Sequence, residues 1–99
     1  MMHIKYNVRR GDNPTSYTFD NDKVLLDDIE LDFSEVPAGA DVLVEELETD
    51  KVVRAWRDDE GIMWVELRQQ HDKDAPHEER FPKWFNAQTG EVLDIENPV

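Results

Sequence analysis

The stretch from Asp41 to Gln69 constrains the fold most, because it combines the densest apolar content with two successive turn signals. Three runs rich in Val, Ile and Trp are separated by two polar tetrads, 48–51 and 58–61. Short runs of this kind between polar turns are typical of β-strands, and Gly61 can supply the positive φ needed where the second turn ends. We therefore predict a three-stranded meander with strands at 41–47, 52–57 and 62–68.

A helical interpretation of the first part of this stretch remains open. On a helix, one face would carry an apolar stripe made of Val44, Leu47, Val52, Ala55 and Trp56. Against a helix, Thr49 and Asp50 would fall in its interior and Lys51 would interrupt the apolar stripe. The strand interpretation of 41–58 is favoured, with the helix as its alternative.

Alternation of apolar and polar residues predicts further strands on both sides of the meander. Residues 3–9 and 15–20 both alternate, which predicts an N-terminal hairpin. Residues 23–33 predict a strand interrupted after position 26, and 91–95 predict a short final strand. Residues 34–40 contain Pro37 and are excluded from a central strand, with room for one short helical turn. Residues 69–80 contain almost no apolar side chain and predict a mobile polar loop.

This pattern predicts a single acidic all-β domain over residues 1–99, with room for one short helix. About seven short strands separated by frequent turns are typical of a small antiparallel barrel or sandwich. One segment resembles bacterial SH3-type domains in its turn and core residues, which are Val36-Pro37-Ala38-Gly39, Val42, Val44, Val53, Trp56, Gly61 and Trp64-Val65. The resemblance implies an SH3-like barrel, the favoured form, and implies no function.

The charge of the chain is strongly acidic and unevenly distributed. It has 24 acidic and 11 basic residues, a net charge of −13, and residues 20–60 alone hold fifteen acidic and four basic residues. Such a surface repels nucleic acid and anionic membranes and attracts a basic partner. The chain contains no cysteine and no long apolar run. We therefore expect a cytoplasmic protein that binds a basic protein, with no direct contact to nucleic acid or membrane.

The candidate partner-binding residues are six carboxylates from the middle of the chain and one tryptophan: Asp28, Glu30, Asp32, Glu45, Glu46, Glu48 and Trp84. Positions 28, 30 and 32 alternate, so a strand would present their carboxylates roughly 6 to 7 Å apart on one face. Phosphates along one nucleic-acid strand recur at a similar interval. The same carboxylates equally suit a solvated face that guards an edge strand. Trp84 is expected to be exposed and to supply apolar contact.

The sequence contains no recognisable catalytic or metal-binding motif. The loop after position 70 is rich in possible ligands, namely His71, Asp72, Asp74, His77, Glu78 and Glu79. Two histidines six positions apart are not a metal signature, and a closed zinc site needs about four ligands held at fixed distances. A nucleophile elbow, a phosphate-binding glycine loop and a cysteine nucleophile are all missing from the sequence. We expect neither enzymatic activity nor a cofactor.

Three functional hypotheses follow from the sequence. The leading one is a non-enzymatic inhibitor of a basic nucleic-acid-binding protein, of the kind found among phage-encoded antagonists of host defence and nuclease immunity proteins, with nucleic-acid mimicry as its mechanism. The first alternative is a structural or assembly module of a phage or bacterial complex, in which edge strands pair with neighbours. The second is a small barrel that binds a small molecule or a metal.

Overall fold

The computed structural model describes residues 2–10, 15–26, 29–71 and 83–93. Its elements are the strands β1 (Met2–Arg10), β2 (Tyr17–Asp20), β3 (Lys23–Leu26), β4 (Ile29–Asp32), β5 (Val52–Arg57), β6 (Met63–His71) and β7 (Phe85–Asn86), and the 3₁₀ turn η1 (Val44–Glu46). The prediction of an all-β chain with about seven strands and at most one short helix is confirmed. Within the described ranges, no helix is long and apolar enough to cross a membrane.

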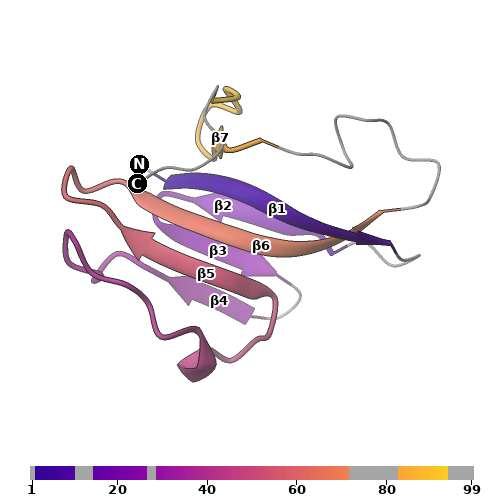
Figure 1. The fold of residues 1–99 in the computed structure, drawn as a ribbon, viewed down its shortest axis with the longest axis horizontal. Coiled ribbons are helices and arrows are strands. Elements are labelled where there is room, and N and C mark those ends of the chain that lie inside the picture. Colours follow the sequence, from indigo (N-terminus) through magenta and orange to yellow (C-terminus); the bar gives the residue numbers. More distant parts are fainter. Residues whose placement is uncertain (1, 11–14, 27–28, 72–82, 94–99) are drawn as a thin grey trace.

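The strands form two sheets that pack face to face (Figure 1). The large sheet has the strand order β5-β6-β1-β7, and the small sheet has the order β2-β3-β4. In the part of the chain that the structure describes, no strand pairing connects the two sheets, so the architecture is a sandwich and closure into an SH3-like barrel is not observed.

The centre of the large sheet differs from the predicted pairing. β1 pairs in parallel with β6, from Met2 opposite Met63 to Arg10 opposite His71, and antiparallel with β7. The predicted N-terminal hairpin is therefore wrong, because β2 pairs with β3 in the small sheet. A strand in the middle of a sheet needs partners on both sides, and a nine-residue parallel ladder with β6 satisfies far more of the β1 backbone than a short hairpin would.

The hydrophobic core fills the space between the two sheets. The buried side chains that form it are Met2, Ile4, Val24, Leu26, Leu31, Phe33, Val52, Ala55, Met63, Val65 and Leu67. In β1, β3, β4 and β6 they occupy alternate positions, as the period of a strand requires. The amino-acid alternation thus decides which side of each strand faces the core.

The meander is only partly confirmed. β5 occupies 52–57 as predicted, and it pairs antiparallel with β6 across a turn where Gly61 has a φ of 86°. The predicted strand at 41–47 is wrong, and so is the alternative helix. Asp41 makes one isolated bridge to Trp56 and the Val42 N–H donates to the Ala55 carbonyl at 2.9 Å, after which the chain leaves the sheet and forms η1. Local turn hydrogen bonds replace the sheet ladder there, which leaves the acidic side chains of the segment in solvent.

Two further predictions concern the connections. The interruption after position 26 is confirmed, because β3 and β4 pair antiparallel with Leu26 opposite Ile29. The polar loop predicted at 69–80 begins too early, since β6 continues through position 71. Gln69 is buried, and its side-chain amide accepts from the Thr15 N–H at 2.7 Å and donates to the Thr15 carbonyl at 2.8 Å. Residues 72–80 of that loop, Asp28, and positions 94 and 95 of the predicted last strand lie outside the described residues.

Candidate protein-binding surfaces

The outer face of the small sheet carries two of the predicted site residues. Glu30 and Asp32 are exposed on β4, which is an edge strand. Lys23 on the neighbouring strand places its Nζ 3.3 Å from Glu30 Oε1, and the hydrogen bond and charge of Glu30 raise the pKa of Lys23, with smaller contributions from Asp32 and Asp20. This face is therefore acidic, but one cation at its centre partly compensates its three carboxylates.

Hydrogen bonds to Ser34 keep Asp32 in its charged form. The Ser34 N–H donates to Asp32 Oδ1 at 2.9 Å. The side-chain and backbone hydrogen bonds from Ser34 lower the pKa of Asp32 below its ordinary value, because they stabilise the carboxylate. The negative charge at the end of β4 thus persists well into the acidic range.

Residues 41–50, which we call the acidic arm, carry the remaining predicted carboxylates. The exposed acidic side chains of the arm are Asp41, Glu45, Glu46, Glu48 and Asp50, and the arm contains neither Lys nor Arg. Leu43 is 58% exposed, one of the most exposed large apolar side chains in the described ranges. The arm therefore combines uncompensated negative charge with an exposed apolar group.

A surface hollow lies between the acidic arm and the edge of the large sheet. It encloses about 420 Å³ and is lined by Val44, Glu45, Leu47, Glu48, Thr49, Asp50, Val52 and Arg68. Apolar side chains and carboxylates share its walls. Arg68 Nε donates to the Asp50 carbonyl at 2.8 Å, which fixes the far end of the arm against β6. The hollow thus offers apolar contact within reach of negative charge.

The predicted exposure of Trp84 is wrong, because its side chain is fully buried. The segment at 85–86 pairs with β1, so Trp84 lies over the outer face of the large sheet. There its ring lies edge-on to two other tryptophans, with centroid distances of 5.7 Å to Trp56 and 5.1 Å to Trp64. His3 lies edge-on to Trp64 at 4.4 Å. We call these four residues the tryptophan cluster, and its packing makes Trp84 a stabilising residue.

Asp58 fixes the turn beside the tryptophan cluster. Its carboxylate accepts hydrogen bonds from Trp64 Nε1 at 2.8 Å and from the backbone N–H groups of Glu60 at 2.9 Å and Ile62 at 3.0 Å. Burial alone would raise the pKa of Asp58, but these hydrogen bonds outweigh it and lower the pKa below the ordinary value. For His3, burial disfavours the charged imidazolium and lowers the pKa, with Asp58 partly opposing that change.

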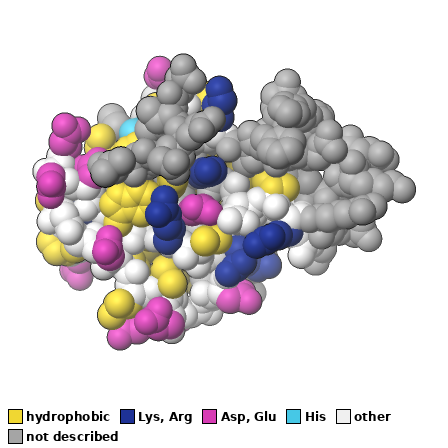
Figure 2. Space-filling model, viewed as in Figure 1, with side chains coloured by type: hydrophobic (Ala, Val, Ile, Leu, Met, Phe, Trp, Pro, Cys, Tyr) yellow, Lys and Arg dark blue, Asp and Glu magenta, His cyan; other side chains and the backbone are white. Residues whose placement is uncertain are grey.

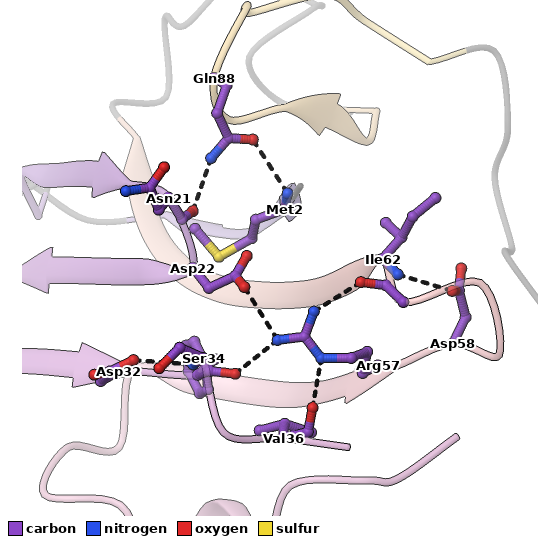
Figure 3. A network of polar contacts seen from close by, with 12 residues as sticks. Met2, Asn21, Asp22, Asp32, Ser34, Val36, Arg57, Asp58, Ile62 and Gln88 are labelled. Atoms are coloured by element: carbon purple, nitrogen blue, oxygen red, sulfur yellow. Dashed lines mark hydrogen bonds and ion pairs between the residues drawn. The ribbon is translucent and has the colours of Figure 1, made fainter. Parts of the chain in front are cut away.

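Arg57 is a buried cation that connects the two sheets (Figure 3). Its guanidinium donates to the carbonyls of Phe33 at 2.8 Å, Val36 at 2.6 Å and Gly61 at 2.7 Å, and Nη2 lies 3.2 Å from Asp22 Oδ2. Because its donors are engaged inside the molecule, Arg57 has a structural role and is not a surface for partners.

Sequence reasoning missed the concentration of cations on the outer face of the large sheet. Lys5 and Arg9 on β1, Arg54 on β5 and Arg68 on β6 all alternate with core positions and share this side. Figure 2 shows Lys and Arg side chains across the middle of this face and acidic side chains mostly towards its margins. The polar positions of β1 were a visible signal, but the strand pairing was needed to place Arg54 and Arg68 beside them.

No group of three or more His, Cys, Asp or Glu side chains in the described ranges could hold a metal ion. Of the ligand candidates in the sequence, those from Asp72 to Glu79 lie outside these ranges. Comparisons of the chain with models of protein families, with curated proteins and with solved structures find no match in any of the three. Functional inference therefore depends on the surfaces described above.

Proposed function

We propose that the protein is a non-enzymatic binding protein whose acidic surface occupies a basic protein partner, one that itself binds nucleic acid. The observation that supports this most is the acidic arm. It presents five exposed carboxylates without a cation of its own, next to the exposed Leu43 and a hollow lined by apolar side chains, carboxylates and one cation, Arg68. Negative surfaces of this kind steer basic partners and set the register of binding.

The hollow suits the side chain of a lysine or arginine. Such a side chain has an apolar stem and a charged head, and it buries the stem while the head stays near water or a carboxylate. Val44, Leu47 and Val52 would contact the stem, and the carboxylates of Glu45 and Glu48 would pair with the head. Leu43 takes the role of apolar contact that the sequence suggested for Trp84, because removing an exposed apolar side chain from water is favourable.

In this proposal, the outer face of the small sheet contributes less to partner binding than the acidic arm. Glu30 is already paired with Lys23, so a partner must compete with an internal cation there. Glu30 and Asp32 keep the strand spacing of roughly 6 to 7 Å that resembles successive phosphates, which is the basis for nucleic-acid mimicry. Phage antagonists of host defence and nuclease immunity proteins are commonly small and acidic, and this likeness in composition makes them the favoured biological setting.

A pull-down from lysate at roughly 50 and 500 mM salt tests the proposal, because an electrostatic complex weakens as salt screens the charges. We expect a basic nucleic-acid-binding protein at low salt, and less of it at high salt. DNA or RNA added to the purified complex should then compete with the acidic protein for that partner. Capture of a neutral partner that resists high salt would contradict the proposal.

Two matched triple variants identify the surface. One is Glu45→Gln/Glu46→Gln/Glu48→Gln in the arm, and the other is Asp20→Asn/Glu30→Gln/Asp32→Asn on the small sheet; each removes three negative charges. We expect the arm variant to slow association with the captured partner about tenfold and to flatten its salt dependence, whereas the strand variant has a smaller effect. Equal losses in both variants would mean that total charge, and not the arm, steers binding.

The edge position of β4 favours a second candidate, an assembly module. In an antiparallel pair, hydrogen-bonded residues alternate along the strand, and the Phe33 N–H donates to the Asp22 carbonyl at 2.9 Å. The backbone groups of Glu30 and Asp32 therefore point away from β3, where another strand can add. Glu30→Pro removes one outward N–H without breaking the ladder to β3. If β4 mediates assembly, this variant should abolish salt-resistant self-association in sedimentation, and unchanged self-association would exclude β4.

A further inference from the structure

The outer face of the large sheet presents a set of cations that the acidic surface function does not use. Lys5, Arg9, Arg54 and Arg68 share this side of β1, β5 and β6, and we call them the basic face. The one carboxylate that these three strands place on the same side is Glu66. In a chain with a net charge of −13, four cations against one carboxylate form a local patch of opposite sign.

Glu66 is already engaged inside the basic face. Arg54 Nε lies 3.5 Å from Glu66 Oε1, and Asn7 Nδ2 donates to Glu66 Oε2 at 2.9 Å. The Glu66 side chain is only 14% exposed, whereas that of Arg54 is 54% exposed. Glu66 thus orients Arg54 and Asn7, and the outward charge of the face stays positive.

The interval between the side chains of the basic face on β1 matches the interval between alternate side chains of an extended polypeptide. Lys5, Asn7 and Arg9 occupy alternate positions of β1, so their side chains recur at roughly 6 to 7 Å along the strand. An extended acidic segment presents carboxylates at the same interval when every second residue is Asp or Glu. Asn7 can donate a hydrogen bond between the two cations, and Arg68 on β6 adds a planar donor group that suits carboxylates.

The aromatic side chains of this face argue against single-stranded nucleic acid as the occupant. Non-specific binding of single strands depends on exposed aromatic rings on which bases stack. The Arg54 guanidinium lies 4.5 Å from the centroid of the Trp56 ring and covers it, while Trp64 and Trp84 are buried. In the described ranges the outer face therefore offers charge without an open stacking platform, and the acidic remainder of the chain repels a long polyanion.

We propose that the basic face docks an extended acidic segment of a partner protein, with carboxylates at alternate positions paired to Lys5, Arg9 and Arg68. Arg68 also lines the hollow beside the acidic arm, but Lys5 and Arg9 lie on β1, which β6 separates from the β5 edge, so this proposal does not rest on the proposed function. If both hold, the protein connects a basic and an acidic partner.

Fluorescence anisotropy with three labelled probes at roughly 50 mM salt tests this proposal. The probes are an eight-residue peptide of alternating Glu and Thr, the same peptide with Gln in place of Glu, and an eight-nucleotide oligo-dT. We expect the Glu peptide to bind more tightly than either of the other two. The double variant Lys5→Gln/Arg9→Gln should weaken its binding about five- to tenfold, since ion pairs near the surface contribute only modestly.

A matched double variant controls for net charge. Lys23→Gln/Lys83→Gln also removes two positive charges, but Lys23 lies on the small sheet and Lys83 alternates with Trp84, so neither belongs to the basic face. It should leave the affinity for the Glu peptide within about twofold of the wild-type value. Equal weakening by both double variants, tighter binding of oligo-dT than of the Glu peptide, or equal affinity for the Glu and Gln peptides would each overturn the proposal.

Discussion

The two ends of the outer face of the large sheet are built from the same strands and differ in almost every other respect. At the covered end, Trp84 is fully buried against Trp56 and Trp64. At the open end, Lys5, Arg9 and Arg68 remain on the surface. One continuous sheet face thus contributes a second apolar layer at one end and a charged surface at the other.

Residues at the covered end stabilise the fold, whereas residues at the open end remain available to partners. Aromatic packing at the covered end removes large apolar areas from water, which is the dominant stabilising effect in folding. Exposed cations at the open end gain little from one another and contribute little to stability. Substitutions at the covered end should therefore lower the free energy of unfolding, and substitutions at the open end should change binding alone.

The largest effect is expected for Trp84→Ala. Removing a buried tryptophan leaves a cavity beside Trp56 and Trp64, and such substitutions lower the free energy of unfolding by about 3 to 5 kcal/mol. Urea denaturation followed by circular dichroism measures this change. Trp84→Phe keeps most of the packing and should lose clearly less, whereas a loss below about 1 kcal/mol for Trp84→Ala would remove the distinction between the two ends.

Two arginines of β5 sharpen the same contrast. Arg57→Leu leaves three carbonyls and Asp22 without their buried donor, which should lower the free energy of unfolding by about 3 kcal/mol. Arg54→Leu, three positions earlier, removes a half-exposed cation from Glu66, which keeps its hydrogen bond from Asn7, and a contact with Trp56; it should lose at most about 1 kcal/mol. Similar losses for the two variants in urea denaturation would show that Arg57 does not carry the connection between the sheets.

A smaller effect is expected from pH at the covered end. Because burial lowers the pKa of His3 below 6.5, the unfolded chain takes up a proton on this residue before the native protein does. The contribution of neutral His3 to stability is therefore complete above pH 6.5 and is lost as the pH falls below it. His3→Phe should flatten the decline in the free energy of unfolding between about pH 7.5 and 5.5, because phenylalanine takes up no proton. If the decline is unchanged in His3→Phe, other titratable groups cause it.

Asp58 responds to pH in the same direction but at lower values. Its pKa in the folded protein lies below the ordinary 3.8, so its contribution is present above that value and is lost as the pH falls through the folded pKa. The two groups thus act in separate pH windows, and a titration of stability resolves them.

The smallest effect is expected at the open end. Lys5→Gln/Arg9→Gln should change the free energy of unfolding by less than about 0.5 kcal/mol, because neither side chain is buried. A loss above about 1 kcal/mol in urea denaturation would mean that these cations hold the fold, and it would make their effect on peptide binding uninterpretable.

Local patterns in the sequence predicted several strands themselves. The run 52–57 became β5 as predicted, and β6 begins within one residue of its predicted start, because short apolar runs between polar turn segments indicate strands. The break between β3 and β4 was equally readable from its two aspartates. The acidic character of Glu30, Asp32 and the arm residues followed from composition.

Pairing and burial between distant segments could not be read in this way. Nothing local to β1 indicates that its neighbours are β6 and β7, and β1 lies far from both in sequence. Trp84 was predicted to be exposed because it follows a polar loop and stands next to Lys83, yet Trp56 and Trp64, distant in sequence, surround its ring. The basic face escaped detection for the same reason, since its members come from three strands. The predicted strand at 41–47 did not form because the backbone hydrogen bonds to the edge of β5 extend only from Gly39 to Val42.

The parallel pairing of β1 with β6 also has a consequence for the order of folding. β1 precedes the other described strands in the sequence, but both of its partner strands, β6 and β7, come late. Contacts of such long sequence separation require the closure of a large loop before they gain any stability, which slows folding. The small sheet, made of neighbouring strands, can form early, whereas β1 must wait for β6 and β7 before it is paired.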